Sequence, residues 1–191
     1  MLTVLVIDES RSRAGEICAG LALAGYQVAA ILAGAENLTA EVEKLQPDVI
    51  LIDTDSPSRD TLENLAAMNK NMPRPVVIFT QADGQETIRD AVKAGVSAYI
   101  VDGLDPKRIK PIVEVARARF EDTQALRREL DEVSKKLTDR KLVDKAKGVL
   151  MKARGLDEDA AYHAMRKLAM ERGQSMAKVA CDVIDMARVL L

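Results

Sequence analysis

The chain has few aromatic, sulfur and imidazole side chains. Among its 191 residues there is no tryptophan, aromatic residues make up 3%, and there are two cysteines and one histidine. So few rings exclude a row of aromatic side chains as the main surface for stacking nucleic-acid bases. Cys18 and Cys181 lie far apart and lack metal or redox spacing. We therefore expect reduced, buried cysteines in a cytoplasmic protein.

Long apolar runs are also missing. No run approaches the roughly 20 residues that cross a membrane. The N-terminus enters an apolar strand pattern without the basic region or cleavage site of a secretory signal, so we expect a cytoplasmic protein with no membrane attachment. Apolar residues make up 48% and charged residues 30%. These values are typical of a globular chain that buries one large or two small cores.

Charge is distributed unevenly along the chain. Residues 1–131 carry 15 Lys and Arg against 21 Asp and Glu, a net charge of −6, whereas residues 132–191 carry 13 against 9, a net charge of +4. An acidic first part and a basic tail are typical of a regulatory unit joined to one that meets a polyanion. Ordinary variation in surface charge is an equally good interpretation.

Strand and helix patterns alternate over the first 120 or so residues. Such alternation predicts an α/β fold, with a parallel sheet covered by helices on both faces. The expected strands are Thr3–Ile7, Gln27–Leu32, Val49–Ile52, Val76–Phe79 and Ala98–Val101. The expected helices cover about 11–24, 39–45, 60–71 and 85–94, with a fifth beginning after 105–106.

Acidic and hydroxyl residues follow the expected strands. Asp8 and Glu9 follow the first strand, Asp53 and Asp55 the third, and Thr80 the fourth. Ligands of open α/β sheets bind at these strand ends. Carboxylate oxygens there suit Mg²⁺, and a carboxylate can also accept a phosphoryl group. The alternative interpretation is that acidic loops only solvate the strand ends.

The order of these residues resembles the receiver domain of bacterial two-component response regulators over about residues 1–120. The resemblance implies a flavodoxin-like, five-stranded parallel sheet. It also implies a pocket in which Asp8, Glu9 and Asp53 are the candidate Mg²⁺ ligands, and in which Asp53 is the phosphate acceptor. Thr80 matches the switch hydroxyl of receivers, and Tyr99 matches the aromatic residue whose rotamer follows that hydroxyl.

One position departs from the receiver pattern. Receivers normally place a lysine, usually followed by proline, after the fifth strand, and this chain has Asp102 and Gly103 there. The lysine would bind phosphate as a point charge, whereas a carboxylate adds negative charge beside the anion. We therefore expect a pseudo-receiver that is controlled by a partner protein, with phosphorylation as the alternative. We expect no required cofactor, and Mg²⁺ is the one candidate ion.

A long helix is expected to join the two halves of the chain. Apart from Pro111, no strong helix breaker follows the start at residues 105–106 until Gly155. We expect its first part to pack on the sheet as the fifth helix, and residues 121–137 to form a coiled coil that joins two chains in a homodimer. The alternating spacing of three and four residues that a two-stranded coil needs is found at Leu126, Leu130, Val133 and Leu137.

The basic tail predicts an all-α bundle of three helices. Gly155 is expected to end the first helix, Asp157 to cap the second, Gly173 to close it, and Ser175 to cap the third. Gly148 lies inside the first helix, where glycine costs roughly 1 kcal/mol relative to alanine.

Bare backbone at Gly148, flanked by cations, suits close approach to a polyanion. A solvated helix surface is the alternative for these cations, and Tyr162 fits either a core position or a base contact. The candidate contacts are Arg140, Lys141, Lys145, Lys147, Gly148, Lys152, Arg154, Tyr162, Arg166 and Lys167.

The tail resembles the ANTAR domain, an RNA-binding module of bacterial transcription antiterminators, across residues 137–187. The resemblance implies that the candidate polyanion contacts bind RNA. The matching residues are Ala146, Lys147, Gly148, Leu150, Met151, Ala161, Tyr162, Arg166, Ala169, Met170, Val179 and Ala180.

The whole chain resembles the AmiR/NasR group of antiterminators, and its receiver part is most similar to NasT regulators of nitrate and nitrite assimilation. This implies binding to paired hairpins in leader mRNA, which prevents terminator formation, and an inhibitory NasS-like nitrate/nitrite sensor as partner. The expected domains are 1–120, 121–137 and 138–191. A phosphorylation-controlled, DNA-binding response regulator is the alternative, because three helices also fit a helix-turn-helix variant. We do not expect an enzyme, since the sequence shows no nucleophile with a base and no glycine loop for phosphate.

Overall fold

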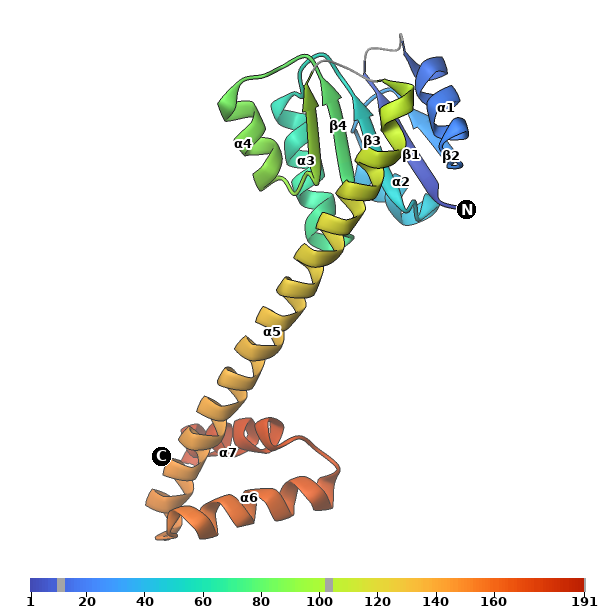
Figure 1. The fold of residues 1–191 in the computed structure, drawn as a ribbon. Coiled ribbons are helices and arrows are strands. Elements are labelled where there is room, and N and C mark those ends of the chain that lie inside the picture. The colour runs from blue at the N-terminus through green and yellow to red at the C-terminus, as the bar shows by residue number, and fades with distance from the viewer. Residues whose placement is uncertain (10–12, 102–104, 191) are drawn as a thin grey trace. The chain divides into compact units, whose positions relative to one another are not determined.

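The computed structural model describes residues 1–9, 13–101 and 105–190, with the side chains of 189 and 190 left out. The chain divides into two compact units, Met1–Gln124 and Ala125–Leu191. The first unit is an α/β domain, and the second consists of helices (Figure 1). The predicted fold class is confirmed.

The first unit is built on a five-stranded parallel sheet with the strand order β2-β1-β3-β4-β5. The strands lie within one or two residues of the predicted bounds, because β-branched runs bounded by turns identify buried strands well. The elements are β1 (Thr3–Asp8), α1 (Ala14–Leu23), β2 (Gln27–Leu32), α2 (Leu38–Leu45), β3 (Val49–Asp53), α3 (Arg59–Asn71), β4 (Val76–Thr80), α4 (Gln85–Lys93) and β5 (Ala98–Val101).

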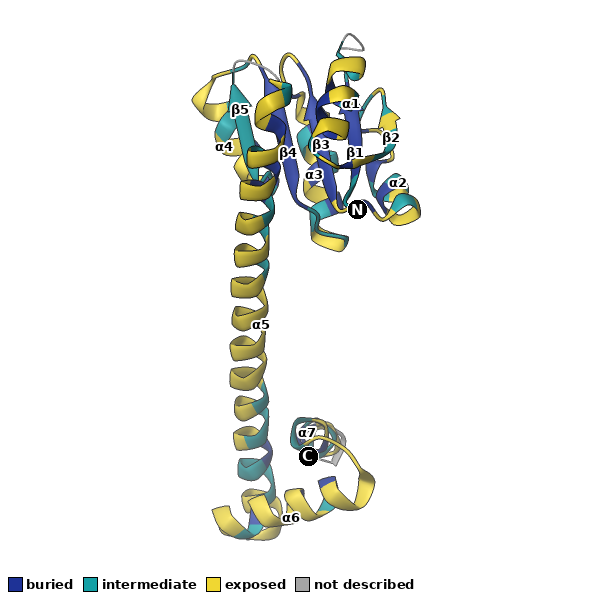
Figure 2. Cartoon of the chain, turned by 45° about the vertical axis from the view of Figure 1, so that its right-hand side comes forward, coloured by how far each residue is buried: buried dark blue, intermediate teal, exposed yellow. Residues whose placement is uncertain are grey.

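Both faces of the sheet are covered by helices. Successive side chains of a strand point to opposite faces. Leu5 and Ile7 therefore join the core beneath α2, α3 and α4, whereas Val4 and Val6 join the core beneath α1 and the first part of α5 (Ile109–Arg154). Figure 2 shows the central strands buried between these two layers. Buried parallel strands of this kind leave only their ends open to ligands.

The first part of α5 packs tightly on the first unit. A Cβ on Gly20 of α1 would come within 2.5 Å of Ile109 Cδ1 and 3.0 Å of Pro106 Cα, so this close helix contact favours glycine. The Tyr26 hydroxyl donates a hydrogen bond of 2.8 Å to Glu114 Oε1. Burial, with help from Glu114, raises the pKa of Tyr26 to about 12. Val113 is fully buried in the same core.

Helix α5 runs without a break for 46 residues. Asp105 caps the preceding 3₁₀ turn (η1, Pro106–Arg108) by accepting a hydrogen bond from Lys107 N at 2.9 Å. Pro111 falls in the first turn of α5, where a missing N–H breaks no helical hydrogen bond. The predicted coil residues are solvent-exposed in the single chain, at 63% for Leu126, 69% for Leu130, 57% for Val133 and 53% for Leu137.

The second unit packs the end of α5 against α6 (Glu158–Arg172) and α7 (Met176–Leu190). Asp157 caps α6 through a hydrogen bond of 2.7 Å from Ala160 N, and Gly173 closes it with a φ of 59°. Ser175 accepts a hydrogen bond of 3.2 Å from Lys178 N. The core residues of this bundle are Ala146, Met165, Ala169, Val179, Ala180 and Ile184. In the described part of the chain, no helix combines the length and apolarity needed to cross a membrane.

Candidate functional site

The acidic pocket lies at the carboxyl ends of β1 and β3. Asp8 and Asp53 are partners in the strand register, and their exposed fractions are 2% and 0%. Burial raises the pKa of Asp53; the Arg13 guanidinium opposes this shift, and the charge on Asp8 adds to it. Asp53 Oδ1 is buried and has no hydrogen-bond partner among the described residues. The sheet therefore holds two carboxylates side by side, and burial disfavours the charged form of Asp53.

Arg13 is the cation that meets Asp53, and this role was not predicted from the sequence. Its Nε lies 3.0 Å from Asp53 Oδ2, and its Nη2 lies 3.9 Å from Asp55 Oδ1. Its carbonyl accepts a hydrogen bond of 3.0 Å from Ile17 N, which fixes Arg13 at the start of α1. The only sequence signal was a cation four residues after an acidic pair, and residues 10–12 before it are outside the described part.

Glu9 faces α3. Its Oε1 accepts a hydrogen bond of 2.7 Å from Thr61 Oγ1, and its backbone N donates one of 3.1 Å to Asp53 O. Within residues 1–9, 13–101 and 105–190, no three His, Cys, Asp or Glu side chains are grouped to hold a metal ion. The three candidate Mg²⁺ ligands thus do not form a ligand set in this arrangement, because Thr61 holds Glu9 and Arg13 holds Asp53. Mg²⁺ binding stays a prediction.

Thr80 and Tyr99 both bond to the loop after β4. Thr80 Oγ1 donates a hydrogen bond of 2.9 Å to Asp55 O and accepts one of 3.1 Å from Ala82 N. Tyr99 donates one of 2.9 Å from its hydroxyl to Ala82 O, and burial raises the pKa of Tyr99. The predicted hydroxyl and aromatic residue are therefore connected through Ala82. Asp102, predicted in the same pocket, lies outside the described residues.

Five of the candidate RNA-binding cations are exposed on the last part of α5. None of the five forms an ion pair with another described residue. They are Arg140, Lys141, Lys145, Lys152 and Arg154. Unpaired cations on a helix surface are available to phosphate.

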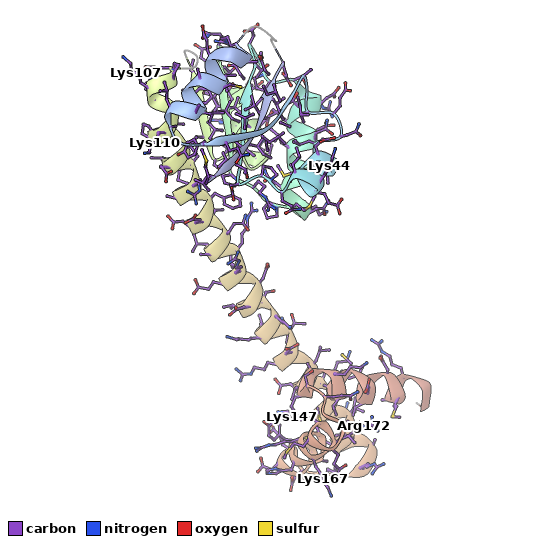
Figure 3. The ribbon with its side chains drawn as sticks, turned by 90° about the vertical axis from the view of Figure 1, so that its right-hand side faces the viewer. Lys44, Lys107, Lys110, Lys147, Lys167 and Arg172 are labelled. Atoms are coloured by element: carbon purple, nitrogen blue, oxygen red, sulfur yellow. The ribbon has the colours of Figure 1, made fainter. Side chains whose placement is uncertain are left out.

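Lys147 differs from its neighbours because two carboxylates already hold it. Its Nζ lies 2.8 Å from Asp144 Oδ1 and 2.7 Å from Glu158 Oε1. Hydrogen bonds to both carboxylates raise the pKa of Lys147. Its side chain is 16% exposed and joins α5 to the first turn of α6. Figure 3 labels Lys147 on the bundle. Lys147 is therefore placed to stabilise the bundle, and its contact with RNA stays a prediction.

Gly148 and Tyr162 lie at the surface of the bundle. A Cβ on Gly148 would meet nothing within 4 Å, so packing within the described chain does not require glycine. Tyr162 is 41% exposed and forms an edge contact with His163, with ring centroids 6.1 Å apart. A groove of about 430 Å³ brings Tyr162 together with Arg140, Lys147 and Ser175, the cap of α7. The groove, including Ser175, was not apparent from the sequence.

The two remaining candidate contacts lie on α6. Arg166 is exposed, and Lys167 lies 3.8 Å from Glu171 Oε1 in a weak surface pair. Lys167 also lines a second groove, of about 590 Å³, together with Arg154. The bundle thus carries candidate cations on both α5 and α6.

Family comparisons agree with this geometry. The model of the response regulator receiver domain family matches residues 4–114, which is more than half of the chain. The chain belongs to this family. The ANTAR domain model matches residues 131–184, so this response regulator carries an ANTAR domain behind its receiver.

Two curated relatives are similar to this response regulator over different lengths. The transcriptional regulatory protein PdtaR of Mycobacterium tuberculosis is 29% identical over 161 residues, which cover 84% of this chain and 78% of that protein. The nitrate regulatory protein of Klebsiella oxytoca is 37% identical over 71 residues, which cover 37% of this chain and 18% of that protein.

Solved structures match the receiver fold. The signal receiver domain of a modulated diguanylate cyclase from Desulfovibrio desulfuricans G20 aligns with a TM-score of 0.56 and 21% identity, covering 63% of this chain and 98% of that one. A CheY-like receiver protein from Methanospirillum hungatei JF-1 aligns with a TM-score of 0.56 and 22% identity, covering 64% and 98%. These identities support a shared fold.

Proposed function

We propose that this response regulator is an RNA-binding transcription antiterminator that binds paired hairpins in leader mRNA and prevents terminator formation. One observation carries the proposal: five exposed cations, none of them ion-paired with a described residue, lie around a sterically open Gly148 inside the segment that matches the ANTAR domain. The five span residues 140–154 of one helix. Cations spaced along one helix in this way suit contact with a phosphate backbone.

The groove at Tyr162 supports a contact with an unpaired base. Hairpin loops present unstacked bases, which proteins bind by ring stacking and by hydrogen bonds to base edges. Tyr162 offers an exposed ring and hydroxyl, Ser175 a second hydroxyl, and Arg140 a guanidinium at the rim. We infer that phosphates contact the α5 cations while a loop base enters this groove.

A homodimer would supply two such surfaces for two hairpins. The four apolar residues of the expected coil are all more than half exposed in the single chain. Exposed leucines at coiled-coil spacing favour a second copy of the same helix as their partner.

We also propose a role in nitrate and nitrite assimilation, with an inhibitory NasS-like nitrate/nitrite sensor as partner. The similarity to the nitrate regulatory protein supports this role over a limited segment. The paired Arg13 and Asp53 support control by a partner, because the usual phosphate acceptor already has a counter-ion.

Fluorescence anisotropy with three labelled probes tests the RNA proposal. The probes are a leader RNA with two hairpins, the same RNA with one hairpin deleted, and duplex DNA of the same sequence. We expect tightest binding to the two-hairpin RNA, with log Kd against log salt giving a slope of magnitude about 3 to 5 if most of the five cations meet phosphates. Equal or tighter binding to the duplex would instead support a DNA-binding response regulator.

A further inference from the structure

We propose that Arg13 is the built-in cation of the acidic pocket, and that a divalent ion binds Asp53 only when the Arg13 guanidinium leaves it. The inference concerns the receiver pocket alone and does not depend on RNA binding. It makes Arg13 the residue that decides which cation this pocket accepts.

Arg13 and Asp53 form a close, largely buried ion pair. Nε lies 3.0 Å from Oδ2, and the side chains are 23% and 0% exposed. A guanidinium at hydrogen-bond distance from a fully buried carboxylate is held firmly, because its departure would leave an uncompensated buried charge. The same guanidinium lies 3.9 Å from the exposed Asp55, which adds a weaker attraction.

Glu9 and the second oxygen of Asp53 are also poorly placed to bind an ion while Arg13 is present. Thr61 Oγ1 binds Glu9 Oε1 at 2.7 Å, so this carboxylate is directed to α3. Both carboxylate oxygens of Asp53 are buried, and neither accepts a hydrogen bond from a described residue; Oδ1 is the one that Arg13 does not approach. An incoming ion at Oδ1 would share one carboxylate with a positive guanidinium, and the two cations would repel each other.

Mg²⁺ is an ion that competes poorly with the Arg13 guanidinium for Asp53. It requires near-octahedral oxygen ligands at about 2.0–2.1 Å and gives up its water reluctantly. Carboxylate oxygens beside a fixed positive charge are a poor start for such a shell. The hydrogen bond of 3.0 Å from Ile17 N to the Arg13 carbonyl fixes the backbone of Arg13 at the start of α1.

Calorimetric titration of the full chain with MgCl₂ tests the inference. The variants are Arg13→Gln, Arg13→Gln with Asp53→Asn, and the matched control Arg59→Gln, which removes an exposed arginine whose Nε lies 2.7 Å from Glu63. We expect Arg13→Gln to bind Mg²⁺ about tenfold or more tightly than the parent, because a competing charge at hydrogen-bond distance is removed. The added Asp53→Asn should abolish that gain, and Arg59→Gln should match the parent. Equal Mg²⁺ affinity in the parent and a folded Arg13→Gln would overturn the inference, as would a gain that survives Asp53→Asn.

A second measurement uses chains that keep Arg13, in case Arg13→Gln does not fold. Nuclear magnetic resonance of the arginine Nε–H groups follows Arg13 in the parent and in Asp53→Asn. We expect the Arg13 Nε proton to exchange slowly in the parent, and to lose this protection in Asp53→Asn or on saturation with Mg²⁺. Protection that is unchanged by both treatments would refute the ion pair as the controlling contact.

Discussion

At the scale of single residues, Gly148 destabilises its helix relative to alanine, and packing does not explain why glycine stands there. The space around its Cα is open, and the residue lies within a continuous helix. We predict that Gly148→Ala raises the free energy of unfolding by about 1 kcal/mol, because alanine loses less backbone entropy in a helix. Urea denaturation followed by circular dichroism measures this change.

The same substitution probes the RNA surface. If a phosphate or sugar approaches the bare backbone, the methyl group of Gly148→Ala should weaken leader-RNA binding about tenfold, since 1.4 kcal/mol corresponds to that factor. Gly173→Ala is an unsuitable control because its φ is 59°. Gly15→Ala suits better, because a Cβ there also meets nothing within 4 Å. A more stable Gly148→Ala protein with parental RNA affinity would remove this backbone from the interface.

Substitutions of Lys147 and Lys152 distinguish a cation that stabilises the bundle from one that binds RNA. Lys147 bridges Asp144 and Glu158, whereas Lys152 is exposed without an ion pair to a described residue. We predict that Lys147→Gln lowers the melting temperature of the bundle, because two carboxylates lose their counter-ion. Lys152→Gln should leave it unchanged while weakening RNA binding about threefold to tenfold and reducing the salt slope by about 1.

Thermal melting and anisotropy across a salt series distinguish the two lysine variants. Lys178→Gln is a useful reference, because Lys178 also pairs with an acidic residue, Asp182 at 3.0 Å, but within one helix. A stable Lys147→Gln protein would show that its two ion pairs contribute nothing. Parental affinity in Lys152→Gln would argue against phosphate contact at that position.

Residue types at strand ends and helix caps could be predicted from the sequence, whereas side-chain pairing could not. Asp8 and Asp53 were placed together because parallel strands end at one edge, and their register confirms that they are partners. The partners of Arg13 and Lys147 were missed. Asp53 lies forty residues from Arg13, and Glu158 eleven from Lys147. A long, flexible cation reaches several neighbours, and spacing alone does not select one.

At the scale of elements, periodicity located the strands well and the helix starts less well. β2 and β5 have their predicted bounds, because turn residues flank short β-branched runs. Helix α1 begins at Ala14 and not near residue 11. The sequence offers no decisive cap there, and Arg13, which precedes the helix, makes no side-chain capping bond.

At this scale we predict that the apolar residues in the middle of α5 form the dimer interface. We expect the parent to be a dimer at micromolar concentration. We expect a chain with Leu126→Glu and Leu130→Glu to be a monomer, because facing carboxylates repel across a coiled-coil seam. Analytical ultracentrifugation measures the mass, and circular dichroism checks that helix content is kept. Leu23→Glu changes an even more exposed leucine, which lies on α1 and not on α5, and should leave the dimer intact. A dimer that persists in the double variant would place the interface elsewhere.

At the scale of the whole molecule, the receiver match ends at residue 114 and the ANTAR match begins at 131. The domain bounds at 120 and 137 stay predictions, because one uninterrupted helix crosses both and offers no sequence break. The receiver and ANTAR domains could be predicted because each has a motif of particular residues along the sequence. The side-chain contacts in the acidic pocket depend on three-dimensional packing, and a sequence motif does not specify them.

Control of the whole molecule by phosphate is testable in one comparison. We predict that prior incubation with acetyl phosphate and Mg²⁺ changes leader-RNA affinity less than twofold, because Asp53 is buried and paired with Arg13. Intact-mass spectrometry of the same samples reports whether Asp53 is modified. A large gain in affinity that accompanies a phosphorylated mass would restore the conventional switch.

The unbroken course of α5 also limits how the length of this protein can change during evolution. Each residue added to a helix turns all that follows by about 100° and moves it on by 1.5 Å. An insertion of seven residues between Gln124 and Arg140 would keep the leucines in line, whereas an insertion of two would turn half of them to the opposite side. Relatives of different length should therefore differ in this segment by whole heptads.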